Sequence, residues 1–182
     1  MKIAIVGEHN RKGGGSYHQS LKTYEILTTI KNIQFNFLTI NSKEKFDEMG
    51  QNFINYNTNF IDQLFFLFYS SNIFKSLLKK FKIKNKFEKF IKKNEIDIII
   101  FMGVSRLSVF CNKIDFITYI FEFHHLFRPD LPEYNFWSDF DFRESLTKIN
   151  VKKSISLIVD TKKKANELVK YYNCYDKKIK II

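Results

Sequence analysis

The sequence contains few residues that cross-link, kink or anchor a chain. Among its 182 residues are two cysteines, two prolines, six glycines and one tryptophan. Cys111 and Cys174 form neither a CxxC pair nor a disulfide framework, which argues against a disulfide-rich secreted domain and predicts a reduced, cytoplasmic protein without a signal peptide. The longest dense apolar run, residues 64–69, is far shorter than the roughly 20 residues that span a bilayer. A single domain that needs no disulfide or metal for stability is expected.

Positive charge is abundant and unevenly distributed. The 30 Lys and Arg residues outnumber the 19 Asp and Glu residues, which leaves a formal charge of +11. The excess is concentrated in residues 79–93, at Lys79, Lys80, Lys82, Lys84, Lys86, Lys89, Lys92 and Lys93. On a helix, Phe87, Phe90 and Ile91 would form an apolar stripe between these lysines. That pattern fits an anionic membrane surface, a nucleic-acid backbone, or a helix whose stripe packs on the protein core.

The N-terminal segment predicts a strand, a glycine turn and a helix. Residues 1–6 are an apolar run typical of a buried parallel strand. After Ser16, a plausible N-cap, apolar side chains recur at helical spacing, at Tyr17, Leu21, Tyr24, Leu27 and Ile30. Between them lie Gly13, Gly14 and Gly15, where free backbone amides at a helix start could hold a phosphate. The Walker A and dinucleotide fingerprints are absent, so a simple strand-to-helix turn is the alternative interpretation.

The remaining pattern alternates strands with helices. Strands are predicted at residues 33–40, 96–103, 116–123, 156–159 and 178–182, and a helix at 162–172. Residues 42–94 predict an insertion of two or three helices, with one stripe at Ile61, Leu64, Phe65 and Phe68. Together these elements indicate an α/β, Rossmann-like, doubly wound, mainly parallel sheet with helices on both faces. Ligands of such sheets bind at the carboxyl ends of the strands, so residues 8–16, 104–108 and the segment from residue 124 onward are the candidate ligand loops.

The segment 121–134 contains the densest set of residues suited to chemistry. It holds both prolines, Pro129 and Pro132, together with His124 and His125. A rigid loop with His, Glu and Arg side chains at the end of a strand is a typical place for an active site. Zinc binding or simple loop packing are alternatives for the adjacent histidines, but no cysteine or third histidine lies nearby to complete a zinc site, and no metal is expected.

These motifs, taken in order, resemble the N-terminal domain of a family 4 glycosyltransferase of the GT-B fold. The strand, glycine turn and helix of residues 3–27 are followed by an acidic-x-x-His pattern at Glu122–His125, where the family usually has Asp. Next come Pro132–Glu133, Arg143 and an exit segment at Ile158–Thr161. The resemblance extends over essentially all 182 residues, and its specificity lies in the combination of motifs.

The resemblance implies a retaining sugar transfer from a nucleotide-diphosphate sugar to a saccharide or lipid-linked acceptor, without a cofactor. The amides of Gly13, Gly14 and Gly15 would bind the donor diphosphate. Catalytic roles would fall to His124 or His125, which hydrogen-bond the sugar, and to Glu122. Acceptor contacts or loop ordering are expected from the remaining candidates, Ser105, Arg106, Glu133 and Arg143.

The resemblance also implies how the protein is organised and where it works. Residues 1–182 would be one acceptor-side domain, and the donor-binding C-terminal domain of relatives would lie outside them, which leaves this chain alone inactive. The basic segment and the 60–69 stripe would hold the enzyme on the inner face of a membrane. A stand-alone anion-binding or membrane-surface module without catalysis is the alternative. Nucleic acid is not an expected partner, because no motif that reads nucleic acid is present.

Overall fold

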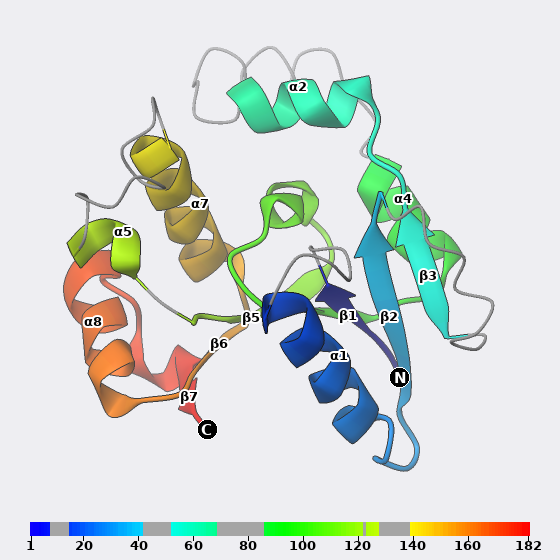
Figure 1. Cartoon of the computed structure of the whole chain (residues 1–182), viewed down its shortest axis with the longest axis horizontal. Helices are drawn as coiled ribbons and strands as arrows, with labels where there is room; N and C mark the ends of the chain where they lie inside the picture. Colours follow the sequence, from blue (N-terminus) through cyan, green and yellow to red (C-terminus); the bar gives the residue numbers. More distant parts are fainter. Residues whose placement is uncertain (8–14, 42–51, 69–85, 122, 128–138) are drawn as a thin grey trace.

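The computed structural model describes residues 1–7, 15–41, 52–68, 86–121, 123–127 and 139–182, and these segments contain one parallel sheet (Figure 1). Its seven strands run in the order β3-β2-β1-β4-β5-β6-β7. In chain order the strands are β1 (Lys2–Gly7), β2 (Gln34–Ile40), β3 (Phe53–Tyr56), β4 (Ile98–Phe101), β5 (Asp115–Tyr119), β6 (Ser156–Val159) and β7 (Ile179–Ile181). Every neighbouring pair is parallel, which confirms the predicted fold class.

The helices connect these strands on both faces of the sheet. They are α1 (Gly15–Leu27), α2 (Phe60–Phe68), α4 (Lys86–Lys93), the 3-10 turn η2 (Arg106–Phe110), α5 (His124–Phe127), α7 (Asp139–Lys153), α8 (Lys162–Tyr172) and the 3-10 turn η3 (Asp176–Lys178). From β1 the chain moves outward through β2 to β3, and then returns to the other side of β1 with β4. The strand order therefore reverses between β1 and β4, which is where sheets of this type bind ligands.

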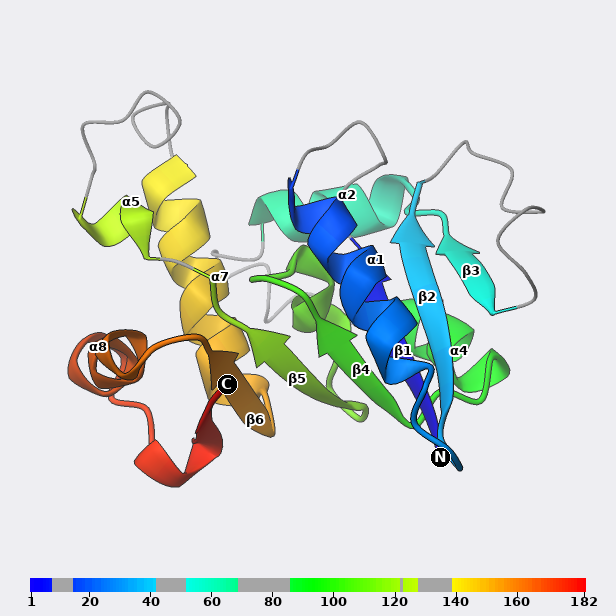
Figure 2. The ribbon, with the colours of Figure 1, turned by 60° about the horizontal axis from the view of Figure 1, so that its bottom comes forward.

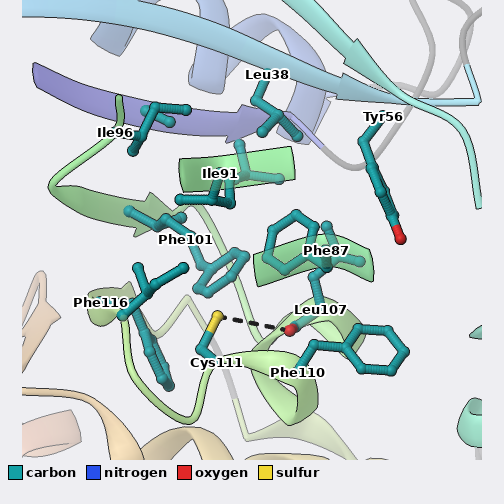
Figure 3. Close-up of a cluster of buried hydrophobic side chains, with 14 of the residues drawn as sticks. Leu38, Tyr56, Phe87, Ile91, Ile96, Phe101, Leu107, Phe110, Cys111 and Phe116 are labelled. Carbon is teal, nitrogen blue, oxygen red and sulfur yellow. Dashed lines mark hydrogen bonds between the residues drawn. The ribbon is translucent and has the colours of Figure 1, made fainter. Parts of the chain in front are cut away.

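The larger part of the core lies on the face that carries α4 and α7 (Figure 3). Alternate residues of the strands point to this face, and the rings of Phe101 and Phe116 meet edge to face with centroids 5.3 Å apart. Phe87 and Ile91 of α4 are fully buried against them. The Cys111 thiol lies in the same cluster, where burial raises its pKa to about 12, so it stays protonated and packs as an apolar group.

Helix α1 covers the opposite face over β1 and β2 (Figure 2). Tyr17 and Tyr24 are buried there and contact the ring of Phe37 edge to face. The ring lies so close to Gly7, at the carboxyl end of β1, that a Cβ on this residue would be 2.7 Å from Phe37 Cζ. Any larger residue at this position would therefore force the Phe37 ring to move. The residue that ends the predicted stripe, Ile30, lies beyond the end of α1 and is exposed.

The same face is less covered over β5 and β6. Ile117, Tyr119 and Ile158 point to the side that carries α1, and each is only partly buried. Among the described helices, α1 is the one that packs on this side, and its contacts are to β1 and β2. The helices of the second half of the chain, α7 and α8, pack on the other side.

The predicted helical insertion at residues 42–94 is wrong in one part and correct in others. Residues 53–56 form β3, which pairs with β2 at the edge of the sheet. The stripe at residues 61–68 does form helix α2, and in α4 Phe87 and Ile91 of the predicted stripe are buried in the core. Lys79, Lys80, Lys82 and Lys84 lie outside the described residues. No helix in the described segments is long and apolar enough to cross a membrane.

Candidate functional site

The carboxyl ends of β1, β4 and β5 are the edge of the sheet to which the predicted site residues belong. Gly13, Gly14, Glu122 and Glu133 lie outside the described residues. Gly15 is the first residue of α1, which follows the carboxyl end of β1. His124 opens α5, but its side chain is outside the part of the chain that the structure describes. The structure describes the side chains of the remaining candidates, His125, Ser105, Arg106 and Arg143.

His125 belongs to a polar cluster formed by three helices. Its Nε2 atom is 3.2 Å from Glu144 Oε2 and 3.4 Å from the Tyr172 hydroxyl. The Tyr172 hydroxyl donates to the same Glu144 oxygen at 2.8 Å. Lys148 lies one helical turn after Glu144 and contacts its other oxygen, Oε1, at 3.0 Å. We call these four residues the His125 cluster. It joins α5, α7 and α8, which lie side by side at one end of the molecule in both views (Figures 1 and 2).

Apolar packing holds the His125 cluster in place. Phe123, just before α5, is buried with β6 and α8, and its ring lies 5.7 Å from the Tyr172 ring. The Phe140 ring of α7 lies 5.9 Å from the imidazole of His125. His125 is only 6% exposed, although it lies six residues after the end of β5. The imidazole is consequently fixed by packing as well as by hydrogen bonds.

The electrostatics of this cluster favour a charged Glu144. Burial on its own would raise the pKa of this carboxyl, but hydrogen bonds from Tyr172, Lys148 and His125 outweigh it and hold the pKa below its ordinary value. Burial and the neighbouring Glu144 carboxylate together raise the pKa of the Tyr172 phenol. Tyr172 is therefore a permanent hydrogen-bond donor and Glu144 a permanent acceptor at neutral pH.

Because the Glu144 carboxylate only accepts hydrogen bonds, it determines which nitrogen of the His125 imidazole carries the proton. For Nε2 to bond Glu144 it must carry the proton, and in a neutral imidazole Nδ1 is then an acceptor. The arrangement suits a histidine that receives a hydrogen bond or a proton from a hydroxyl group.

The segment after β4 is held by a second polar network, centred on Asn150 of α7. The fully buried Asn150 amide donates to the Ser105 carbonyl at 3.2 Å and to the Ser108 hydroxyl at 2.9 Å, and its oxygen accepts from Thr118 at 3.3 Å. The Ser105 hydroxyl accepts from the Leu107 amide and caps η2. Ser105 is 1% exposed, so the contacts that it makes are those of a loop-ordering residue.

The two arginines lie on the surface near this network. Arg106 is exposed, and its guanidinium lies over the Phe142 ring, 4.7 Å from the centroid. Arg143 is also exposed, and its carbonyl accepts from the Thr147 hydroxyl. Glu133, the other candidate for loop ordering, lies outside the described segments. In the described part of the chain, no three His, Cys, Asp or Glu side chains converge as metal ligands.

Sequence reasoning missed Glu144, Lys148, Asn150 and Tyr172. The Tyr172 ring packs against the core cluster, and nothing in the predicted helix at 162–172 assigns a role to its hydroxyl. Glu144 and Lys148 carry a local signal, the i,i+4 acid–base spacing, which is common on solvated helices and so indicates no site. The distances between Asn150 and its partners along the chain, 32 to 45 residues, leave no local signal at all.

The fold of the chain is similar to that of a known protein, although the sequence identity between the two is low. No protein-family model matches the chain, and no curated protein matches it in sequence. Among solved structures, the chain is similar to sucrose-phosphate synthase from Thermosynechococcus elongatus, with a TM-score of 0.65 and 12% identity. The match covers 100% of this chain and 47% of that protein, so the chain spans about half the length of its structural neighbour. That neighbour is a GT-B glycosyltransferase, and the likeness shows that this chain has the Rossmann-like fold of one part of it.

Proposed function

We propose that this chain is the acceptor-side, N-terminal domain of a retaining glycosyltransferase in cell-surface glycan synthesis. It would act on a nucleotide-diphosphate sugar and transfer the sugar to a saccharide or lipid-linked acceptor. The observation that carries the proposal is the fold match over the whole chain to part of sucrose-phosphate synthase. The family 4 resemblance of the Glu122–His125, Pro132–Glu133 and Arg143 motifs supports it independently.

The proposed roles follow the carboxyl edge of the sheet. The amides at Gly13, Gly14 and Gly15 bind the donor diphosphate at the start of α1, where the backbone dipoles favour an anion. His125 receives a hydrogen bond from the transferring sugar, and the fixed imidazole supports this assignment over His124. Glu122 is proposed to order the loop or to act near the acceptor, and Ser105 and Arg106 to contact the acceptor or order the loop after β4.

A membrane-borne acceptor would place the protein at an anionic membrane surface. In α4, Phe87 and Ile91 are buried and Phe90 is partly buried, while the lysines are exposed, so the contact would be electrostatic attraction without insertion of this helix. Phe60 and Ile61 of α2 are exposed apolar residues that could add shallow insertion.

Calorimetric titration tests the proposal. UDP- and GDP-sugars and the free nucleotides are titrated into the 182-residue chain and into the longest form produced from the natural coding sequence. We expect binding by the longer form and little or none by the 182-residue chain, because relatives hold most donor contacts in the second domain. Tight nucleotide binding by the short chain would contradict the proposal and favour a self-sufficient binding module.

A further inference from the structure

The His125 cluster assigns one hydrogen-bonding role to each atom in it. Glu144 Oε2 receives hydrogen bonds from both the Tyr172 hydroxyl, at 2.8 Å, and His125 Nε2, at 3.2 Å. Lys148, which can only donate, contacts Oε1 at 3.0 Å. The carboxylate is thus surrounded by donors, and its two oxygens are distinguished by their partners.

We infer that Glu144 is a positioning residue that fixes His125 in its Nε2–H tautomer and so presents Nδ1 as an acceptor to a substrate hydroxyl, with Tyr172 and Lys148 fixing Glu144. This inference rests on the proposed sugar transfer, because it assigns the chemical state of the histidine that is proposed to meet the sugar. Glu144 touches no substrate in this account. It acts by determining which imidazole nitrogen is free.

The roles of the two oxygens make the effect of Glu144→Gln predictable. In the variant, Lys148 selects the amide oxygen, since an ammonium group can only donate. The amide NH₂ then faces His125 and Tyr172 and donates to Nε2 of the imidazole. A neutral His125 must consequently move its proton to Nδ1, so that the nitrogen proposed to accept from the substrate becomes a donor. The substitution removes no atom from the packed cluster and reverses the tautomer.

Long-range ¹H–¹⁵N NMR of histidine-labelled protein reads this tautomer directly. The longest natural form is used at a pH where the imidazole is neutral, and the His125 signals are identified by their loss in His125→Gln. We expect the Nε2–H pattern in the wild type and in Glu25→Gln, the same change at an exposed carboxylate of α1. Glu144→Gln should show the Nδ1–H pattern. Identical patterns in the wild type and Glu144→Gln would overturn the inference, whether or not the protein transfers sugar.

Kinetics with nucleotide sugars test the consequence for the reaction. We expect kcat/KM to fall about 100-fold in Glu144→Gln, the lower end of what general acid–base catalysis contributes, and the Glu144→Gln/His125→Gln double variant to be no slower than His125→Gln. Tyr172→Phe should lower kcat/KM by a smaller factor, and its control is Tyr171→Phe, an exposed tyrosine of the same helix. A reversed tautomer with unchanged kcat/KM would overturn the inference.

The two hypotheses fail in different ways. A wild type with the Nε2–H pattern but no transfer from any nucleotide sugar would overturn the proposed function and leave the assignment of Glu144 to the tautomer intact. Transfer by the wild type, together with a mixture of both tautomers, would support the proposed function and overturn the inference about Glu144.

Discussion

At the scale of single residues, the environment of Glu144 makes the stability of the fold depend on pH. Its carboxylate is partly buried, with 17% of the side chain exposed, and three donors from α5, α7 and α8 converge on it. The pKa of this carboxyl is lower in the folded protein than the ordinary value of 4.5. A depressed folded-state pKa stabilises the fold above the unfolded-state pKa, and this stabilisation is lost as the pH falls through the folded-state pKa.

Glu144→Gln should therefore destabilise the protein at neutral pH and have less effect in acid. We expect the free energy of unfolding to fall by about 1.5–3 kcal/mol at pH 7, the size of a hydrogen bond to a charged group. The difference from the wild type should shrink below pH 4.5, where the wild-type carboxyl begins to take up protons. Urea unfolding across this pH range measures it, with Glu25→Gln as the control. A difference that stays constant into strong acid would show that the charge of Glu144 is irrelevant to stability.

Gly7 gives a second prediction at the residue scale. A Cβ at this position would lie 2.7 Å from Phe37 Cζ, so Gly7→Ala forces the ring to move in a closely packed layer. We expect a loss of about 1–3 kcal/mol in the free energy of unfolding. Thermal and urea unfolding measure the loss, and the double variant with Phe37→Leu should recover part of it, because leucine leaves the space free. If the double variant loses the sum of the two single losses in the free energy of unfolding, a close approach of residue 7 to the Phe37 ring is contradicted.

At the scale of elements, one buried side chain ties α7 to β5 and to the segment after β4. Asn150 is fully buried, and its amide and oxygen bond to Ser105, Ser108, Thr118 and the carbonyl of Leu146. Such a network stabilises the fold only when every member is satisfied. The position of the loop that carries Arg106 at the carboxyl edge of the sheet therefore depends on a residue of a distant helix.

Asn150→Leu should be strongly destabilising although leucine has a similar size. It leaves buried polar groups of Ser105, Ser108 and Thr118 without their Asn150 partner, and we expect a loss of about 2–4 kcal/mol. The control is Asn166→Leu, the same substitution at an exposed position of α8, which should change the free energy of unfolding by less than about 0.5 kcal/mol. Equal effects of the two substitutions in urea unfolding would contradict a structural role for the network.

The sequence predicts elements with a strong local pattern well. The helical stripe of Tyr17, Leu21, Tyr24 and Leu27 forms α1, and the apolar runs at β1, β2, β4 and β6 form strands close to their expected bounds. The short strand β3 was missed because its Phe53–Tyr56 segment is only four residues long and its definition comes from pairing with β2. The predicted strand at 116–123 ends at Tyr119, and the chain then leads to α5. Side-chain networks such as those of Glu144 and Asn150 join distant segments, so no local pattern predicts them.

At the scale of the whole molecule, the topology of the sheet determines where a ligand would bind, and the net charge determines which partners are attracted. The all-parallel sheet with its reversal of strand order between β1 and β4 defines where a ligand would bind. The charge of +11 favours association with anionic partners but carries no information about the fold. If one surface of the protein is attracted to a membrane, binding depends on the positions of the exposed lysines as well as on the net charge.

Local attraction to a membrane predicts that the position of the lysines matters. Charge reversal in α4, at Lys86, Lys89, Lys92 and Lys93, should weaken binding to vesicles of anionic phospholipid at least about 10-fold. The matched control reverses the same number of exposed lysines at the other end of the molecule, at Lys162, Lys163, Lys170 and Lys177. Co-sedimentation with vesicles measures the binding of both charge-reversal variants. Equal weakening by the two sets would indicate a response to net charge alone, and no weakening by the α4 set would remove α4 from the contact.

Nucleotide-sugar turnover tests whether this fold serves sugar transfer with His125 at its centre. The release of nucleoside diphosphate from UDP- and GDP-sugars is measured with the longest natural form of the protein and with saccharide and lipid-linked acceptors. We expect acceptor-dependent release by the wild type and by Glu25→Gln, and about 100-fold less by His125→Gln. Release that is absent with every donor, or that is unchanged in His125→Gln, would contradict it.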